Sequence, residues 1–535
     1  MSKKLLRAVS LLLGLVLLVS ITTALFTVSA AGEETLLTDG ETQYNGVIPV
    51  TPDFGDRDFL CLNTTEPKNV FVSDRVFATS LPSSYDARDY ISFPSVKNQG
   101  SSGACWAFST IAAMEIDSVA QGYYTSAPDF SESHLVWFAY SDVTAEHNIC
   151  SSNPYSEGGN WLYAQSVLSG LGGCANESDF PFNSELSDYS DFGNYSLTDR
   201  YDHSSGIIAD STVVFTDVDS VKNWIMVHGS VTVNMNFRAG GFNTDKTGYY
   251  STRSDINHMV CIVGWDDNYS KSNFASAPST DGAWLVRNSL LDDGKYPEYF
   301  WVSYKSKLSD FVGFSVRTDE NIASVYSYNT ATMTEYKTVK SGSSVANVYT
   351  INSDETPSSV SFYVVKGGSD SPVNVKATCY LYDGKKSDIL CSASATYSRA
   401  GWFTLDFDTD EIISAGTRVM VELTYTSDGD VNIPVEPKAG TYSSAVYTSK
   451  AGCSYCMFDG ATEYSDMTSC DLGDAYVNLY TVSAEADSPD EPGVTCTCKC
   501  HKDGISGFIF KILCFLWRIF GKTDKRICEC GAYHW

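Results

Sequence analysis

A single cysteine carries the strongest chemical signal in this sequence. Cys105 lies in the stretch Gln-Gly-Ser-Ser-Gly-Ala-Cys-Trp-Ala-Phe-Ser, which runs from Gln99 to Ser109. Residues 105–121 are rich in Ala, Ile and Met and end before Gly122, which predicts a helix beginning at the cysteine. A thiol in the first turn of a helix is favoured as a thiolate, because unpaired backbone N–H groups and the helix dipole attract negative charge. The backbone N–H of Cys105 and the side-chain amide of Gln99 could stabilise an oxyanion, so the stretch predicts a nucleophile for acyl transfer.

A nucleophilic thiol needs a base, and two downstream segments supply the candidates. His258 precedes an apolar run that predicts a buried strand, and Asn288 follows a second strand-like run at residues 284–286. In this arrangement His258 takes the proton of Cys105, while Asn288 accepts from the other ring nitrogen and orients the imidazole. Taken alone, His258 could also be a core histidine bonded to backbone.

These segments resemble the active-site regions of papain-like (cathepsin-type) cysteine peptidases. The resemblance rests on Ser-Gly-Ala-Cys-Trp at residues 102–106, on the order Cys, His, Asn, and on the 153 residues from the cysteine to the histidine. In that family the histidine follows the cysteine by about 130–150 residues. The resemblance implies an α+β papain-like peptidase domain over residues 81–318, with a helical left lobe and a β-barrel-like right lobe. It also implies catalysis by the three residues named above, an oxyanion hole that includes Gln99, and no cofactor. The tract at residues 263–274 is most similar to bacterial members.

The sequence departs from the family pattern at two places near the site. Ser102 stands where the family has a cysteine that forms a disulfide. Asn288 and Ser289 are followed by Leu290, where the family has a tryptophan that covers the His–Asn hydrogen bond. We expect a leucine or Trp301 to replace that cover, or the bond to be exposed and activity to be weaker.

Substrate binding has a fainter trace in the sequence. Gly158 and Gly159 resemble the family's glycine strip, where a missing Cβ lets an extended substrate backbone approach closely. An ordinary Gly-Gly turn is the alternative. His134 falls where the family begins a helix, so we interpret it as structural.

The start of the chain and its charge indicate the compartment. A basic beginning and an apolar run at residues 9–28 predict a signal peptide over residues 1–30, with an uncleaved membrane anchor as the alternative. Residues 31–80 form a short pro or N-terminal segment. The net charge of −29 and the lack of a basic stripe favour an acidic secreted or surface-attached protein that does not bind nucleic acid.

A change of hydrophobic period marks a second domain at residues 319–483. Apolar residues alternate along residues 360–364, 373–381, 403–407 and 419–425, which predicts a β-sandwich. The region resembles the lectin-like domain of some bacterial papain-like proteins. That resemblance implies binding of a glycan or cell-wall polymer, and the alternative is a structural wall packed on the peptidase.

The sandwich region also contains cysteines. Cys379 and Cys391 could bridge neighbouring strands. Cys453, Cys456 and Cys470 leave one thiol without an assigned partner.

An acidic linker at residues 484–493 separates a tail at residues 494–535. The tail combines Cys-x-Cys pairs with histidines, which could hold Zn²⁺ or form disulfides. These candidates are Cys496, Cys498, Cys500, His501, Cys528, Cys530 and His534. The apolar stretch at residues 507–520 is too short to cross a bilayer, so we expect contact with a membrane surface or burial in a small knob.

Taken together, the sequence predicts a secreted or surface-attached cysteine endopeptidase that acts on protein or peptide substrates through an acyl-enzyme. The alternative is an adhesin in which a catalytically weak papain fold serves as a scaffold.

Overall fold

The computed structural model describes the peptidase and sandwich regions and little of the two ends of the chain. The described residues are 47, 81–140, 154–169, 172–183, 195, 199, 205–292, 294–318, 321–329, 333, 335–366, 371–436, 450–484, 526–527 and 533–534. The chain divides into two compact units, Met1–Ser483 and Ala484–Trp535. In the second unit the described residues are Ala484 and two short strands, β21 (Arg526–Ile527) and β22 (Tyr533–His534), which pair with each other.

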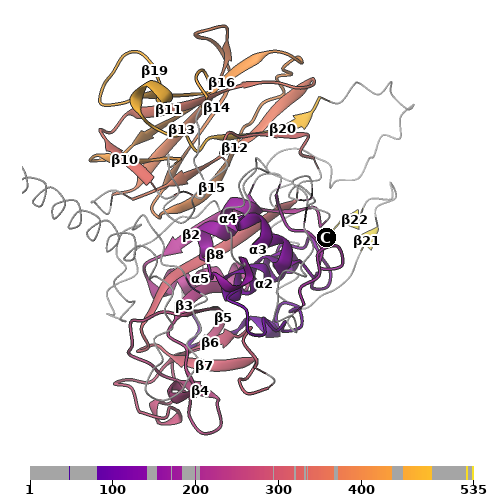
Figure 1. Ribbon diagram of the computed structural model, residues 1–535, viewed down its shortest axis with the longest axis vertical. Coiled ribbons are helices and arrows are strands. Elements are labelled where there is room, and N and C mark those ends of the chain that lie inside the picture. The colour runs from indigo at the N-terminus through magenta and orange to yellow at the C-terminus, as the bar shows by residue number, and fades with distance from the viewer. Residues whose placement is uncertain are drawn as a thin grey trace, which may run out of the picture. The chain divides into compact units, whose positions relative to one another are not determined.

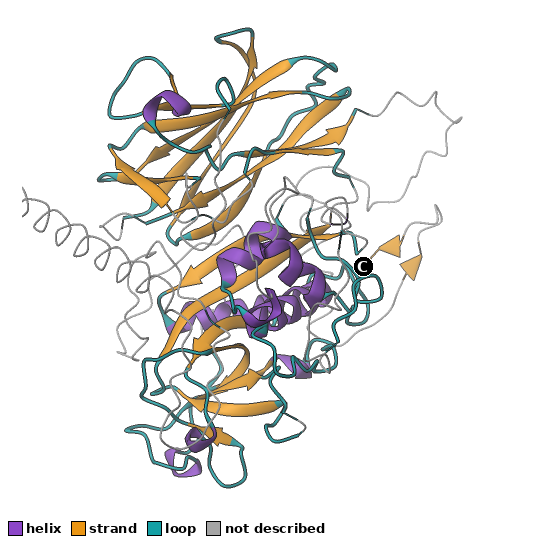
Figure 2. Ribbon diagram, in the orientation of Figure 1, coloured by secondary structure: helices purple, strands orange, loops and turns teal. Residues whose placement is uncertain are grey.

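Four described α-helices belong to the first 230 residues (Figures 1 and 2). They are α2 (Cys105–Ala120), α3 (Glu132–Tyr140), α4 (Trp161–Leu168) and α5 (Val218–His228). Helix α2 is buried along almost its whole length, and its core positions pack with those of α3 and α4 in one cluster. It begins at the cysteine as predicted and ends one residue early, before Gly122, whose φ of +83° suits glycine.

Helices α4 and α5 each start after a capping residue. Asn160 accepts hydrogen bonds from the backbone amides of Leu162 and Tyr163 in α4, and Asp217 accepts one from the Ser220 amide in α5. Helix α5 ends at Gly229, which adopts the left-handed conformation.

The strands of the first domain form a consecutive part of one long sheet that contains parallel and antiparallel pairs. They are β1 (Ser84–Asp86), β2 (Ile207–Phe215), β3 (Val231–Met235), β4 (Gly248–Tyr249), β5 (His258–Asp266), β6 (Ala283–Arg287), β7 (Tyr299–Ser303) and β8 (Leu308–Thr318). Their order is β4-β7-β6-β5-β3-β8-β2, and β1 pairs with β5. The run predicted as a strand after His258 and the run predicted before Asn288 are therefore neighbours in this sheet, as β5 and β6.

The second domain is the predicted β-sandwich. Its strands are β9 (Ser324–Tyr326), β10 (Glu335–Val339), β11 (Ser343–Thr350), β12 (Glu355–Val364), β13 (Val373–Tyr382), β14 (Lys386–Tyr397), β15 (Gly401–Asp406), β16 (Arg418–Thr426), β17 (Val431–Val435), β18 (Ser454–Met457), β19 (Ser465–Asp466) and β20 (Asn478–Ser483). One sheet has the order β14-β13-β16-β11-β18-β19, and β15-β12-β20-β9 face it across a shared apolar core. The alternating positions picked out in the sequence, such as Val375, Val421 and Phe362, fill this core.

The two domains share a sheet, which the sequence did not predict. Strand β15 of the sandwich pairs with β2 of the first domain through Gly401 opposite Val213 and Trp402 opposite Thr212. A Cβ at Gly401 would lie 1.9 Å from the carbonyl oxygen of Thr212, so only glycine permits this approach. The connection between the domains is therefore a hydrogen-bonded sheet as well as a covalent linker.

Candidate active site

Cys105 is the first residue of helix α2 and is fully buried. The turn before it is held by a hydrogen bond from the Gly103 amide to the Tyr155 carbonyl, at 2.7 Å. The Cys105 sulfur accepts a hydrogen bond from the backbone amide of Met259 at 3.4 Å. Because Met259 follows His258, this contact places the thiol beside the start of β5, where the candidate base lies.

His258 and Asn288 are joined directly. His258 Nε2 lies 2.9 Å from Asn288 Oδ1. The orientation of the amide is fixed because Asn288 Nδ2 donates to the carbonyls of Leu290, at 2.7 Å, and Pro297, at 3.1 Å. An amide oxygen can only accept, so Nε2 of the imidazole carries the proton. Nδ1 is then the ring nitrogen left to receive a proton from a thiol.

The His258–Asn288 hydrogen bond is shielded from water although the tryptophan of the family pattern is missing. The exposed fractions of His258 and Asn288 are 1% and 2%. The ring of Phe237 lies 4.8 Å from the imidazole, and Tyr296 packs edge-on against Phe237. The expectation of an exposed bond is therefore wrong, because an aromatic cluster from a different part of the chain shields the imidazole.

The two residues considered as replacements for that tryptophan have different surroundings. Leu290 is 1% exposed and belongs to the same core cluster as Phe237 and Tyr296. Trp301 is only half-buried and stacks on Tyr269 at 4.8 Å. The leucine therefore contributes to the apolar surroundings of the site, while the described ring contact of Trp301 is with Tyr269.

Gln99 is buried next to the helix start and is held at both ends of its amide. Its Nε2 donates to the carbonyl of Ser102 at 2.8 Å, and its Oε1 accepts from the hydroxyl of Ser289 at 2.8 Å. The same two residues are also joined through their backbones, because the backbone N–H of Gln99 donates to the Ser289 carbonyl at 2.9 Å. Ser289 was missed as a site residue in the sequence, although its place directly after Asn288 was a usable signal. It connects the loop that carries Gln99 to the segment that follows β6 and carries Asn288.

Burial dominates the protonation of the two reactive groups. It raises the pKa of the Cys105 thiol to about 12, against three hydrogen bonds from backbone amides that act to lower it. It lowers the pKa of the His258 imidazole to about 4, against the hydrogen bond to Asn288 that acts to raise it. In this closed arrangement both groups are therefore neutral at pH 7.

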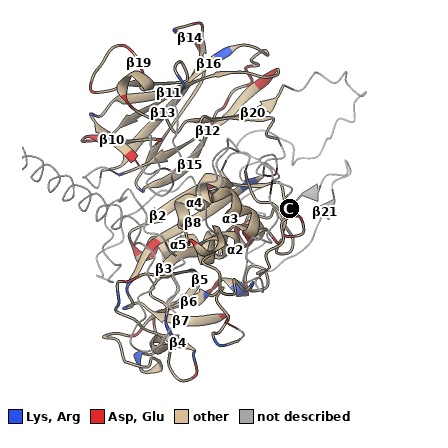
Figure 3. Cartoon of the chain, viewed as in Figure 1, with Lys and Arg blue, Asp and Glu red and all other residues tan. Residues whose placement is uncertain are grey.

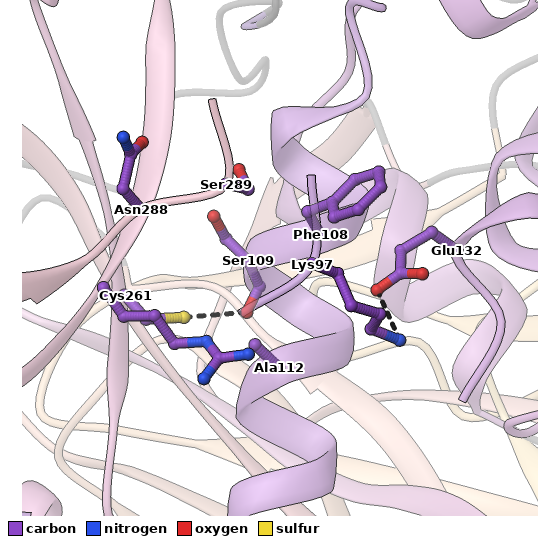
Figure 4. Close-up of a pocket in the computed structure, with 9 residues that line it drawn as sticks. Lys97, Phe108, Ser109, Ala112, Glu132, Cys261, Asn288 and Ser289 are labelled. Atoms are coloured by element: carbon purple, nitrogen blue, oxygen red, sulfur yellow. Dashed lines mark hydrogen bonds and ion pairs between the residues drawn. The ribbon is translucent and has the colours of Figure 1, made fainter. Parts of the chain in front are cut away.

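A buried group of charges lies behind the site, around a small cavity that Asn288 and Ser289 also line (Figure 4). Lys97, two residues before Gln99, pairs with Glu132 of α3 at 2.8 Å and with Glu115 of α2 at 2.9 Å. Burial opposes the charge on Lys97, but the two carboxylates outweigh it and raise the pKa of the amine. Burial raises the pKa of Glu132, and the attraction of Lys97 acts against it. One lysine thus anchors the Gln99 loop to two helices.

The predicted substrate strip contacts another segment of the chain. Gly159 forms a parallel β-bridge with Val47, which also packs against the core cluster of α2. A Cβ at Gly159 would lie 2.3 Å from the Trp106 ring, and the Tyr140 hydroxyl donates to the Gly158 carbonyl. The strip is therefore a backbone edge fixed against the helix that starts at Cys105, and Val47 pairs with it. Its role in substrate binding stays a prediction.

The remaining candidates are His134 and the Cys and His residues of the tail. His134 is buried and its Nε2 lies 2.9 Å from the carbonyl oxygen of Asp199. The Cys and His side chains of the tail lie outside the described residues. Within the part of the chain that is described, no three His, Cys, Asp or Glu side chains gather as a metal site. None of the described helices is long and apolar enough to cross a membrane.

Comparison with known proteins agrees with this geometry. Residues 81–316 match the family described as papain family cysteine protease, and residues 325–481 match the lectin-like domain. Cathepsin L 2 of Paramecium tetraurelia is 28% identical over 202 residues, which cover 37% of this chain and 52% of that relative. Cysteine proteinase 1 of Zea mays is 29% identical over 244 residues, which cover 44% of this chain and 59% of that relative. The chain thus spans about half the length of these curated relatives.

Solved structures match both domains together. One is the clostridial cysteine protease Cwp84 after propeptide cleavage, with a TM-score of 0.62 and 25% identity, covering 75% of this chain and 99% of that one. Another contains the cysteine protease and lectin-like domains of Cwp84 from Clostridium difficile, with a TM-score of 0.62 and 24% identity, covering 82% of this chain and 93% of that one. The fold and the site thus define a cysteine peptidase domain followed by a lectin-like domain. Residues 81–316 are therefore a papain-family cysteine protease domain, and residues 325–481 are a lectin-like domain.

Proposed function

We propose that this protein is a cysteine endopeptidase in which Cys105, His258 and Asn288 carry out catalysis and Gln99 contributes to the oxyanion hole. The observation that supports it most is the 2.9 Å His258–Asn288 contact, which leaves Nδ1 available, beside a cysteine at a helix N-terminus. His258 takes the proton of the Cys105 thiol, and the thiolate attacks the substrate carbonyl. The oxyanion is stabilised by the backbone N–H of Cys105 and by the Gln99 amide, which has a second N–H besides the one given to Ser102. The imidazolium then protonates the leaving amine, and water hydrolyses the acyl-enzyme.

The closed arrangement is, in this proposal, a latent one. Cys105 has no exposed surface, and burial disfavours both the thiolate and the imidazolium. Val47 pairs with Gly159, where we expect the backbone of a substrate to lie. We therefore infer that residues before Leu81 limit access to the site and that their removal lets the thiolate–imidazolium pair form. The related Cwp84 structure was determined after propeptide cleavage.

The location of the protein and its partners besides the peptide substrate can be inferred from the two domains and the start of the chain. Cwp84 is described as a surface layer associated protein, and the beginning of the present chain predicts export. We infer an extracellular or cell-surface location after removal of residues 1–30, and a glycan or cell-wall polymer as a ligand of the sandwich domain. The described Lys and Arg residues are spread along the ribbon of both domains (Figure 3), which favours a partner other than nucleic acid. Metal or disulfide chemistry in the tail, and its contact with a membrane surface, stay predictions from the sequence.

Irreversible labelling with an epoxide-type inhibitor of thiol peptidases tests the proposal. Intact mass under reducing conditions is measured for the full chain, for a chain starting at Leu81, and for both with Cys105→Ala. We expect one adduct that requires Cys105, formed much faster in the shortened chain. Absence of an adduct in the shortened chain would contradict peptidase function and favour the scaffold alternative. Equal labelling rates in both lengths would contradict only the latent state.

A further inference from the structure

Five cysteines of the sandwich domain play no part in the proposed catalysis. All five are free thiols in this structure, and they are Cys379, Cys391, Cys453, Cys456 and Cys470. Four of them are arranged as two facing pairs. In each pair, backbone pairing between neighbouring strands holds the two cysteines close together.

The first pair joins β18 to the short 3-10 helix η7 (Met467–Cys470). The sulfurs of Cys456 and Cys470 lie 3.8 Å apart. The chain returns to this point because β18 pairs with β19, with Cys456 opposite Ser465. Asp466 then caps η7 by accepting from the Thr468 amide at 3.0 Å, and it also accepts from the Gly452 amide at 2.6 Å. The fold therefore holds the two thiols close before any bond forms between them.

Access and location suit oxidation of this first pair. Cys456 is buried, whereas Cys470 is exposed and can be reached by a soluble oxidant. The segment between them includes Tyr464, whose hydroxyl contacts the carboxylate of Glu422 on β16. A bond from Cys456 to Cys470 would close a loop of 15 residues, counted from the sequence, and fix this segment on the outer face of the sheet.

The second pair lies on adjacent strands. Cys379 of β13 and Cys391 of β14 are directly opposite each other in the antiparallel register. Opposed residues have Cβ atoms about 4.5–5.5 Å apart, and a disulfide needs about 3.5–4.5 Å, so a small approach of the strands is enough. Both side chains are buried in the core of the sandwich.

The fifth cysteine has different surroundings. Cys453 lies in the turn before β18, and its thiol interacts with the Tyr328 hydroxyl. Its carbonyl accepts from the Val348 amide at 2.8 Å. Cys453 is thus the odd thiol that the sequence left unassigned.

We propose that Cys456 with Cys470, and Cys379 with Cys391, form two disulfides when the exported chain meets a disulfide oxidant. In each case the two thiols lose two protons and two electrons and an Sγ–Sγ bond forms, while the oxidant disulfide is reduced to two thiols. Cys453 stays reduced. The inference depends on export from the cell but not on peptidase activity.

Peptide mapping tests the pairing directly. The full chain with Cys105→Ala, which cannot digest itself, is treated with oxidised glutathione, blocked with iodoacetamide and digested without reduction. We expect two cross-linked peptides, one joining residues 379 and 391 and one joining 456 and 470, with Cys453 alkylated. A cross-link from Cys453 to Cys456 or Cys470, or alkylation of all five thiols, would overturn the proposal.

Thermal unfolding gives an independent measurement. Closing a loop of this length constrains the unfolded chain, so Cys470→Ser should lower the Tm of the oxidised protein by roughly 5 °C and leave that of the reduced protein nearly unchanged. Cys453→Ser is the matched control, and the difference between its oxidised and reduced Tm should equal that of the parent. An oxidised Cys470→Ser protein with the Tm of the parent would contradict the first disulfide.

Discussion

Replacing Asn288 with alanine removes the group that orients the imidazole without touching a bond-making atom. Its Oδ1 accepts from His258 Nε2 at 2.9 Å and from the Leu290 amide at 3.2 Å. In the variant the buried ring N–H loses its partner, and an unsatisfied buried donor costs about 1–3 kcal/mol. The cost is larger when the ring becomes an imidazolium, so we expect about 2–3 kcal/mol of lost transition-state stabilisation. That corresponds to a fall of roughly 30–150-fold in kcat/KM.

The assay for this variant is cleavage of a quenched fluorescent peptide by the chain starting at Leu81. Asn234→Ala is the matched control, because Asn234 is equally buried on the neighbouring strand β3 and donates to Asp310 at 2.7 Å. We expect the control to lose some stability and less than about 3-fold in kcat/KM, since Asn234 has no described contact with the imidazole. A change below 3-fold for Asn288→Ala, or an equal loss in the control, would refute the orienting role.

Two further predictions concern the oxyanion donor and pH. Gln99→Ala should lower kcat by about 10²–10³-fold, and Ser289→Ala should lower kcat/KM by about 2–10-fold, the worth of one hydrogen bond. Since Ser289 acts by holding the Gln99 amide, the double variant should match Gln99→Ala alone, and additive losses would contradict this. Burial lowers the folded pKa of His258 to about 4 from an ordinary 6.5, so the unfolded chain binds more protons between these values. The free energy of unfolding should therefore fall as pH drops from 6.5 to 4, by up to about 3 kcal/mol more than in His258→Gln, as measured by urea unfolding. Equal pH profiles for the two proteins would show that His258 is not held neutral by burial.

Local sequence was enough to identify the candidate catalytic groups. The glutamine, cysteine, histidine and asparagine occur in short patterns, and the helix and strands that carry them follow from nearby residues. Helix α2 begins at Cys105 because apolar residues follow it, and β5 and β6 are continuous apolar runs. The core positions of the sandwich could be predicted for the same reason, because apolar residues alternate along its strands.

The tertiary structure alone decided which distant residues complete the site. The Gln99–Ser289 contact joins residues that are 190 positions apart in the sequence. Phe237, just after the end of β3, packs against the imidazole of His258, although nothing in the sequence around Phe237 indicates a functional role. The pairing of Cys456 with Cys470, and the joining of β2 to β15 across the domain boundary, also depend on long-range packing. Local patterns set backbone conformation, whereas such contacts result from how the elements close on one another to bury their apolar faces.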